Sequence, residues 1–223
     1  MPNVTADVFA YGLAAGLSGT AFLATVIVLS TQQGVANAVG LLAGVWLVLG
    51  VAVVGAALLA DVVIGAGGDQ VVVALVQLLL GLWLLQAAWR VRPGQNDGPD
   101  IAARLAGMAA KAEALEPVQA VKLGVGVALL PKRLVITLLA GAAIGAAGVA
   151  TAQGLALSVL YLLVATALIW GTLTVFVVGG KRASRFLEAG RAWVVANAMT
   201  LAFAVALLFG VLFTGQGLLK LIA

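Results

Sequence analysis

The chain has 223 residues, of which 64% are hydrophobic and only 9% are charged, and its mean hydropathy is +1.20. Soluble domains carry about 25% charged residues, so this composition excludes a soluble domain and predicts a chain that is solvated by lipid. Cysteine and histidine are absent, which excludes disulfides, thiol redox chemistry, zinc sites built on these ligands and histidine-dependent catalysis; we expect no cofactor, no metal and no catalytic residue.

The first apolar run begins near Val8 with no Lys or Arg before it. A cleavable signal peptide needs a positive segment there, so we expect this run to be retained as a span. Runs of about twenty apolar residues match the length that a helix needs to cross roughly 30 Å of hydrocarbon. Six such runs predict six transmembrane helices, at residues 8–30, 38–60, 70–89, 121–148, 154–178 and 197–221.

The basic residues behind the net charge of +4 gather in two of the connections, 90–120 and 179–196. The connections 31–37, 61–69 and 149–153 contain no Lys or Arg. Because basic loops stay in the cytoplasm, this pattern predicts that both termini are extracytoplasmic, with Lys220 as an exception. Membrane topology thus explains why the basic residues gather in these two connections. We therefore expect no nucleic-acid partner.

The 90–120 connection combines a turn-rich stretch, 92–99, with a short amphipathic segment. Asp100 is expected to cap a helix over 101–115 that Pro117 ends. One interpretation is a linker helix on the membrane surface, and the other is a gate or a docking element for a partner.

An internal repeat is visible at an offset of 112 residues, which aligns Gly12–Thr20 with Gly124–Lys132. In both segments small residues precede a step that weakens a helix. An odd number of spans in each half gives the halves opposite orientations, as in many transporters. We therefore expect an all-α integral membrane protein of two inverted three-helix repeats, 1–89 and 121–223, joined by 90–120, with helices one and four broken.

Pro131, Lys132 and Arg133 are the most unusual residues in the apolar parts. Proline breaks or kinks a helix, and Lys132 would lie about 14 Å into a helix that starts near residue 122. A cation there costs about 2.5–3.5 kcal/mol and usually lines a polar path, which indicates a site for an anionic group. Alternatively, the span begins at Leu134 and both cations are ordinary flanking charges at the cytoplasmic interface.

Ser18, Gly19 and Thr20 form the corresponding break in the first span. Glycine permits unwinding, and the hydroxyls could bind substrate; the alternative is close helix packing. Thr137 is either a packing hydroxyl or part of the same path. The predicted substrate-binding residues are therefore Ser18, Gly19, Thr20, Pro131, Lys132, Arg133 and Thr137. The pairs Gly12/Gly16, Gly40/Gly44 and Gly141/Gly145 predict close packing.

No acidic residue lies deep in any predicted span, since Asp61 and Asp69 stand at span ends. A buried carboxylate relay for protons is therefore not expected, nor is a site for divalent cations. These absences favour a substrate that is anionic, zwitterionic or lipid-like.

Six helices with these two breaks resemble the lysine-exporter (LysE) superfamily, and within it the peptidoglycolipid-addressing (GAP, or Sap-like) family. The resemblance is carried by 17–20, 131–141, 180–183, 191–193, 210–213 and 215–218. Gly19, Leu130 and the neutral Thr31–Gln33 stand where that family usually has proline, asparagine and a basic loop.

The resemblance implies export of a small amphiphile, or transfer of a glycolipid, across the bacterial cytoplasmic membrane. We expect an alternating-access exporter whose site lies between the two breaks. The alternative is a non-transporting scaffold in a lipid-export machinery, motivated by the missing coupling residue and the long cytoplasmic connection. The expected partners are membrane lipids and a small-molecule or lipid substrate, and the close-packing glycines would permit a homodimer.

Overall fold

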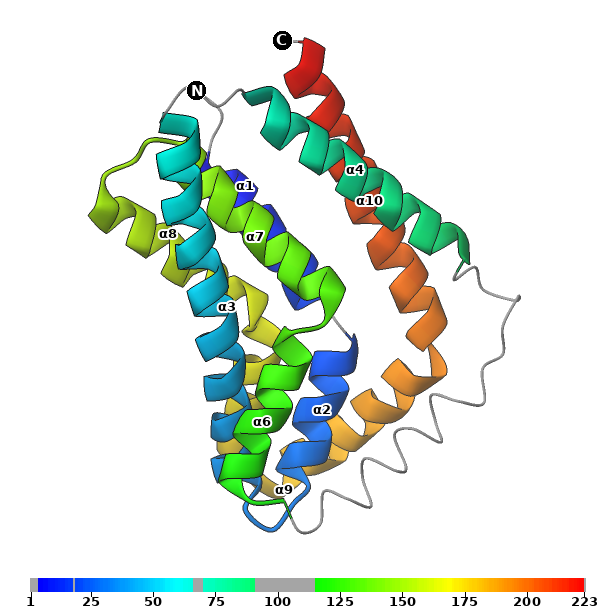
Figure 1. Ribbon diagram of the computed structural model, residues 1–223. Coiled ribbons are helices and arrows are strands. Elements are labelled where there is room, and N and C mark those ends of the chain that lie inside the picture. Colours follow the sequence, from blue (N-terminus) through cyan, green and yellow to red (C-terminus); the bar gives the residue numbers. More distant parts are fainter. Residues whose placement is uncertain (1–3, 18, 66–69, 91–114, 223) are drawn as a thin grey trace.

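The computed structural model describes residues 4–17, 19–65, 70–90 and 115–222, and within these ranges every regular element is an α-helix (Figure 1). The predicted helix over 101–115 lies outside the described residues except for Leu115. The helices are α1 (Val4–Gly16), α2 (Gly19–Leu29), α3 (Gly34–Gly65), α4 (Gln70–Arg90), α6 (Pro117–Ala128), α7 (Pro131–Ala146), α8 (Thr151–Ala165), α9 (Ala167–Ala196) and α10 (Ala198–Ile222).

One helix, α3, is by itself long and apolar enough to cross a membrane, over the 27 residues Gly34–Ala60 with a mean hydropathy of 2.5. Three further candidate spans, α1–α2, α6–α7 and α8–α9, each consist of two helices bent at a short break. The described residues therefore contain up to four candidate spans by length and composition. The predicted spans at 70–89 and 197–221 are represented by shorter apolar stretches, so the prediction of six is not confirmed.

The two predicted breaks are present. The axes of α1 and α2 differ by 59°, and those of α6 and α7 differ by 73°. A third break, which the sequence did not predict, separates α8 from α9 at Thr166 with a bend of 61°. The Thr166 hydroxyl donates a hydrogen bond to the carbonyl of Leu162 at 2.6 Å, and such back-bonding threonines often bend helices.

The helices pack in three sets (Figure 1). The unbroken α3 lies along both α6 and α7, and α4 lies along α10. In the third set α1 lies along α8 and α2 lies along α9, and α1 also packs along α7. Every fourth residue on one face of α3 is buried, namely Leu41, Val45, Leu49 and Val53. This stripe belongs to the main apolar core.

Glycines allow the helices to touch at their backbones. A Cβ atom on Gly124 of α6 would overlap the carbonyl of Leu41, and one on Gly44 of α3 would overlap the carbonyl of Val121. Small residues at such places let membrane helices approach closely. The prediction of close packing is confirmed for Gly12, Gly16, Gly40, Gly44 and Gly141, each of which faces atoms of another helix.

Different helix ends and turns lie at the two ends of the bundle. The start of α1 and the end of α10 lie at one end, and the turn after α2 and the start of α6 lie at the other (Figure 1). At this second end the buried Asn37 amide donates to the Thr31 hydroxyl and to the carbonyl of Leu115, both at 2.8 Å. Asn37 thereby ties the last described part of the long connection to the turn.

Candidate functional site

The breaks of the first, fourth and fifth predicted spans come together around Arg133. A Cβ atom on Gly16, at the end of α1, would lie 2.8 Å from the carbonyl oxygen of Val164 and 3.1 Å from that of Ala165. The Arg133 guanidinium, in the first turn of α7, donates from Nη2 to the Ala165 carbonyl at 2.8 Å. The end of α1, the start of α7 and the end of α8 therefore touch one another.

The junction lies beside the middle of the unbroken span. Gly124 of α6 lies against Leu41, and Gly141 of α7 lies against Val53. The break between α6 and α7 falls between these two contacts. It therefore lies alongside the central part of the Gly34–Ala60 segment.

The fourth-span break follows from Pro131. Leu130 has extended backbone angles (φ −56°, ψ 128°), and Pro131 takes the first position of α7, where its missing N–H costs nothing. The amides of Arg133 and Leu134 both donate to the Leu130 carbonyl. Pro131 thus starts a new helix and places Arg133 within its first turn.

Arg133 is buried, with only 4% of its side chain surface exposed. Apart from the bond to Ala165, its Nε and Nη1 atoms have no hydrogen-bond partner among the residues that the structure describes. A cation at the end of a helix interacts favourably with the helix dipole, so the bond to Ala165 stabilises the end of α8. The N–H groups at Nε and Nη1 nevertheless remain without an acceptor in the described part of the protein.

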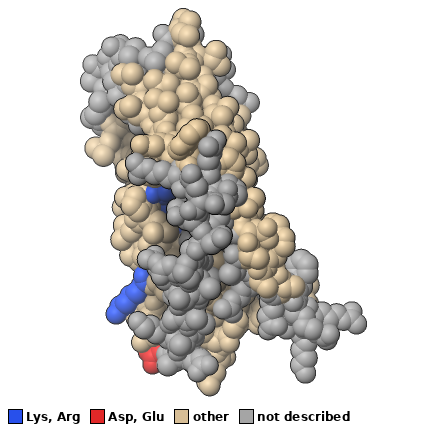
Figure 2. Space-filling view, turned by 90° about the vertical axis from the view of Figure 1, so that its right-hand side faces the viewer, with Lys and Arg blue, Asp and Glu red and all other residues tan. Residues whose placement is uncertain are grey.

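Lys132 differs from its neighbour, since its side chain is half-buried whereas Arg133 is almost fully enclosed. Figure 2 shows atoms of Lys and Arg at two heights on one face, one group recessed and one group protruding. Lys122, on α6, is exposed. The structure thus separates the two adjacent cations of the Pro131–Arg133 motif into a buried one and a partly accessible one.

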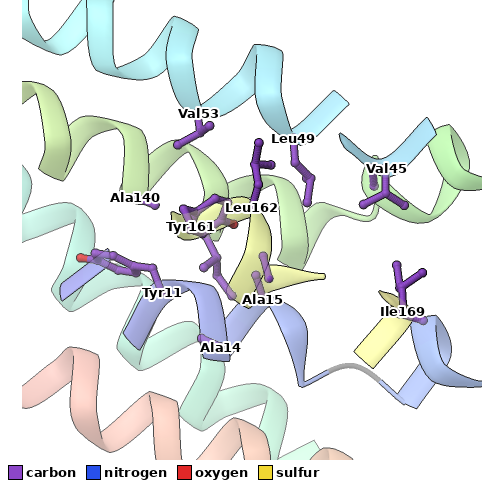
Figure 3. Packing of buried hydrophobic residues seen from close by; sticks show 14 of the residues in the cluster. Tyr11, Ala14, Ala15, Val45, Leu49, Val53, Ala140, Tyr161, Leu162 and Ile169 are labelled. Carbon is purple, nitrogen blue, oxygen red and sulfur yellow. The ribbon is translucent and has the colours of Figure 1, made fainter. Parts of the chain in front are cut away.

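Thr137 is fully buried and fixes α7 to α8. Its hydroxyl donates to the Arg133 carbonyl at 2.7 Å and lies 2.7 Å from the Tyr161 hydroxyl. A hydroxyl has one hydrogen to donate, so Tyr161 is the donor in the second bond. Figure 3 shows Tyr161 among the apolar side chains gathered between α1, α3, α7 and α8.

The structure describes only part of the predicted site in the first span, residues 18–20. Ser18 lies outside the described residues, Gly19 begins α2, and Thr20 belongs to α2 with a side chain that is not described. Since α1 packs along α7 and α8, the end of the first half-span lies at the junction.

Sequence reasoning missed Thr166 and Trp46. The indole Nε1 of Trp46 donates to the Thr166 hydroxyl at 3.0 Å, which ties the third break to α3. The only signal in the sequence was a hydroxyl in the middle of an apolar run, and such residues more often serve close packing.

The two buried hydroxyls at the junction predict an ordered pair of stability losses. Tyr161→Phe removes one hydrogen bond and leaves Thr137 its bond to Arg133, so we expect a loss of about 1 kcal/mol. Thr137→Val removes both bonds and leaves the Tyr161 hydroxyl buried without a partner, so we expect about 2–3 kcal/mol. Thermal unfolding in detergent measures both. Equal losses, or a reversed order, would contradict this hydrogen-bond arrangement.

Comparison with known protein families gives a match over most of the chain. A family model described as Sap, sulfolipid-1-addressing protein, matches residues 8–219, which include both halves of the bundle and the whole junction. No curated protein and no solved structure matches the chain. The family match agrees with the resemblance to Sap-like proteins seen in the sequence.

Proposed function

The chain belongs to the Sap, sulfolipid-1-addressing protein, family, and we propose that it exports a lipid or a small amphiphile across the bacterial cytoplasmic membrane by alternating access. Its family and its apolar helices make it a membrane protein with a lipid-related role. The proposal comprises three statements: the chain transports a substrate, it does so outward, and it crosses the membrane six times.

The observation that carries the proposal is the meeting of three helix breaks around a buried cation. Transporters commonly bind their substrate near the middle of the bilayer between discontinuous helices, whose freed ends supply charges and hydrogen bonds. Here the junction lies beside the centre of the clearest candidate span. A scaffold without transport has no evident need for such an arrangement, because an unpaired buried charge destabilises a protein.

The packing pattern supports two inverted repeats. If the first three predicted spans exchange places with the last three, the first span takes the position of the fourth and the fifth that of the second. The contact of α1–α2 with α8–α9 then becomes the contact of α6–α7 with α3, and the contact of α4 with α10 is unchanged. These three contacts are compatible with a two-fold relation, which is the symmetry that alternating access by rocking repeats requires. The contact of α1 with α7 departs from it, because its counterpart, that of α6 with α2, is minor.

The orientation also remains part of the proposal. The start of α1 and the end of α10 lie at the same end of the bundle, which fits an even number of crossings. The basic residues of the connection 90–120 and of segment 179–196, which the structure includes in α9, support a cytoplasmic location of the opposite end by the positive-inside rule. The absence of cysteine and histidine leads us to propose transport without covalent catalysis.

Reconstitution tests the proposal directly. The purified chain in liposomes should move fluorescent lipids or labelled amphiphiles from one leaflet or compartment to the other faster than protein-free liposomes do. A panel of neutral, zwitterionic and anionic lipids, together with amino acids, gives the substrate class. If nothing moves, while deletion in cells still blocks lipid export and a partner co-purifies, the chain is an accessory scaffold and the transport proposal is wrong.

A further inference from the structure

We propose that Arg133 binds the oxyanion of the ligand, a sulfate, phosphate or carboxylate group, and that the adjacent Lys132 is not needed for this binding. The inference deepens the proposed function and rests on it for the location of the site. It names the chemical group that the junction recognises and the single side chain that recognises it.

The first argument is the unused hydrogen-bonding capacity of Arg133. The side chain is 4% exposed, and its Nε and Nη1 atoms have no partner within the described part of the chain. Burying a guanidinium is unfavourable unless its charge and its donors are matched. The one bond to the Ala165 carbonyl is made to a neutral group. An anionic partner is therefore missing from the described protein.

The described carboxylates stand far from this position. Asp7 lies in the first turn of α1, at the opposite end of that helix from Gly16. Glu116 caps the start of α6, at the opposite end of that helix from the break. Neither helix therefore supplies a counter-ion at the junction, and a ligand can take that place.

The second argument is the electrostatic field at the junction. Both α7 and α9 begin there, at Pro131 and Ala167. Helix N-termini carry a partial positive charge and bind anions. Arg133 lies in the first turn of α7, where a cation adds to this field although an acidic residue would be the stabilising choice. Positive potential is thus concentrated around a guanidinium that has free donors.

The identity of the side chain narrows the ligand class. A guanidinium is planar, and its fork of N–H donors matches carboxylate, phosphate and sulfate groups. Lys132 is only half-buried, and its ammonium group is a point charge on a flexible stem that is not enclosed by the junction. The oxyanion is either part of a lipid headgroup or a free inorganic ion, and both present the same chemistry to Arg133.

Binding to the purified protein in neutral detergent tests the proposal without any transport step. The probes are dioctanoyl phosphatidic acid, dioctanoylglycerol with the same tails and no phosphate, and sodium phosphate and sulfate at matched ionic strength. Tryptophan fluorescence is a suitable readout because Trp46 contacts Thr166 at the junction. We expect phosphatidic acid to bind at least about tenfold more tightly than dioctanoylglycerol, since a buried charge pair is lost with the phosphate.

Matched variants assign the effect to one side chain. Arg133→Gln should weaken phosphatidic acid binding by at least about tenfold, whereas Lys132→Gln should change it less than about twofold. Arg133→Met replaces the buried cation by an apolar side chain, so it should unfold at the wild-type temperature or above and still fail to bind. A lower unfolding temperature for Arg133→Met together with unchanged phosphatidic acid binding would show that Arg133 serves only as a structural cap of α8, which overturns the proposal.

The variant comparison, the inorganic-ion probes and the liposome assay each give a further test of the proposal. Equal losses in the Arg133 and Lys132 variants would indicate diffuse surface electrostatics and overturn the proposal. Binding of free phosphate and sulfate as tight as that of phosphatidic acid identifies an inorganic ion as the ligand, and binding of the lipid alone identifies a headgroup. If liposomes show no transport but Arg133-dependent binding persists, the proposed function fails and this inference stands.

Discussion

Gly124→Ala is expected to destabilise the protein by about 3 kcal/mol, at the upper end of what overpacking usually costs. The added Cβ would overlap the carbonyl oxygen of Leu41 in α3. A backbone carbonyl cannot rotate away as a flexible side chain can, so α3 and α6 would have to separate. The reciprocal variant Gly44→Ala, whose Cβ would overlap the carbonyl of Val121, should show a similar loss.

Gly126→Ala is the matched control for this prediction. Gly126 belongs to the same helix, but a Cβ atom there would meet nothing within 4 Å. Because alanine favours helix by up to about 1 kcal/mol over glycine, we expect this variant to unfold at the wild-type temperature or slightly above. Thermal unfolding of the three variants in one detergent gives the comparison. Indistinguishable unfolding temperatures for Gly124→Ala and Gly126→Ala would disprove the close contact between α3 and α6.

Pro131→Ala is expected to abolish transport while the protein remains folded. Proline lacks the N–H that a continuous helix would use to bond the carbonyl of Val127, and it clashes with that carbonyl. Alanine removes both obstacles and favours a straight fourth span by about 3 kcal/mol, or roughly 100-fold in population. A straight α6–α7 would draw Arg133 away from the carbonyl of Ala165.

Pro117→Ala provides the control, because Pro117 also stands at the start of a helix but lies at the end of α6 that is away from the break. We expect its transport rate in liposomes to equal that of the wild-type chain. Lipid flux and thermal unfolding are measured on both variants. Wild-type flux in Pro131→Ala would show that the break is dispensable and would remove the main structural support for the transport mechanism.

The breaks that could be predicted are those with a local cause. Pro131 cannot donate to an upstream carbonyl whatever surrounds it, and small residues near Gly19 weaken the first span in the same local sense. The close-packing glycines were predictable for a similar reason, because a residue without a side chain in an apolar run favours contact between helices.

The third break had a cause that the sequence does not display. Thr166 stands at the bend, and its hydroxyl accepts a hydrogen bond from Trp46, which lies 120 residues earlier in the chain. A threonine in an apolar run is compatible with a straight helix until its neighbours are known. Only the packing of α8 against α3 reveals which threonine coincides with a bend.

The roles of Lys132 and Arg133 were likewise undetermined by sequence. Adjacent residues on a helix point about 100° apart, so only one of them can face α8 directly. The rotation of α7 about its own axis decides which, and this rotation follows from contacts such as that of Gly141 with Val53. The structure buries Arg133 and leaves Lys132 partly exposed.

The uninterrupted course of α3 has a consequence for the resting state of the transport cycle proposed here. Exchange of the two halves would place α3 where α8 and α9 now bend by 61°. Inward-open and outward-open arrangements of such unequal halves cannot have equal free energies, and a difference of about 1.4 kcal/mol makes one of them tenfold more abundant. The idle protein should therefore open mainly toward one side of the membrane, and substrate should enter first from that side.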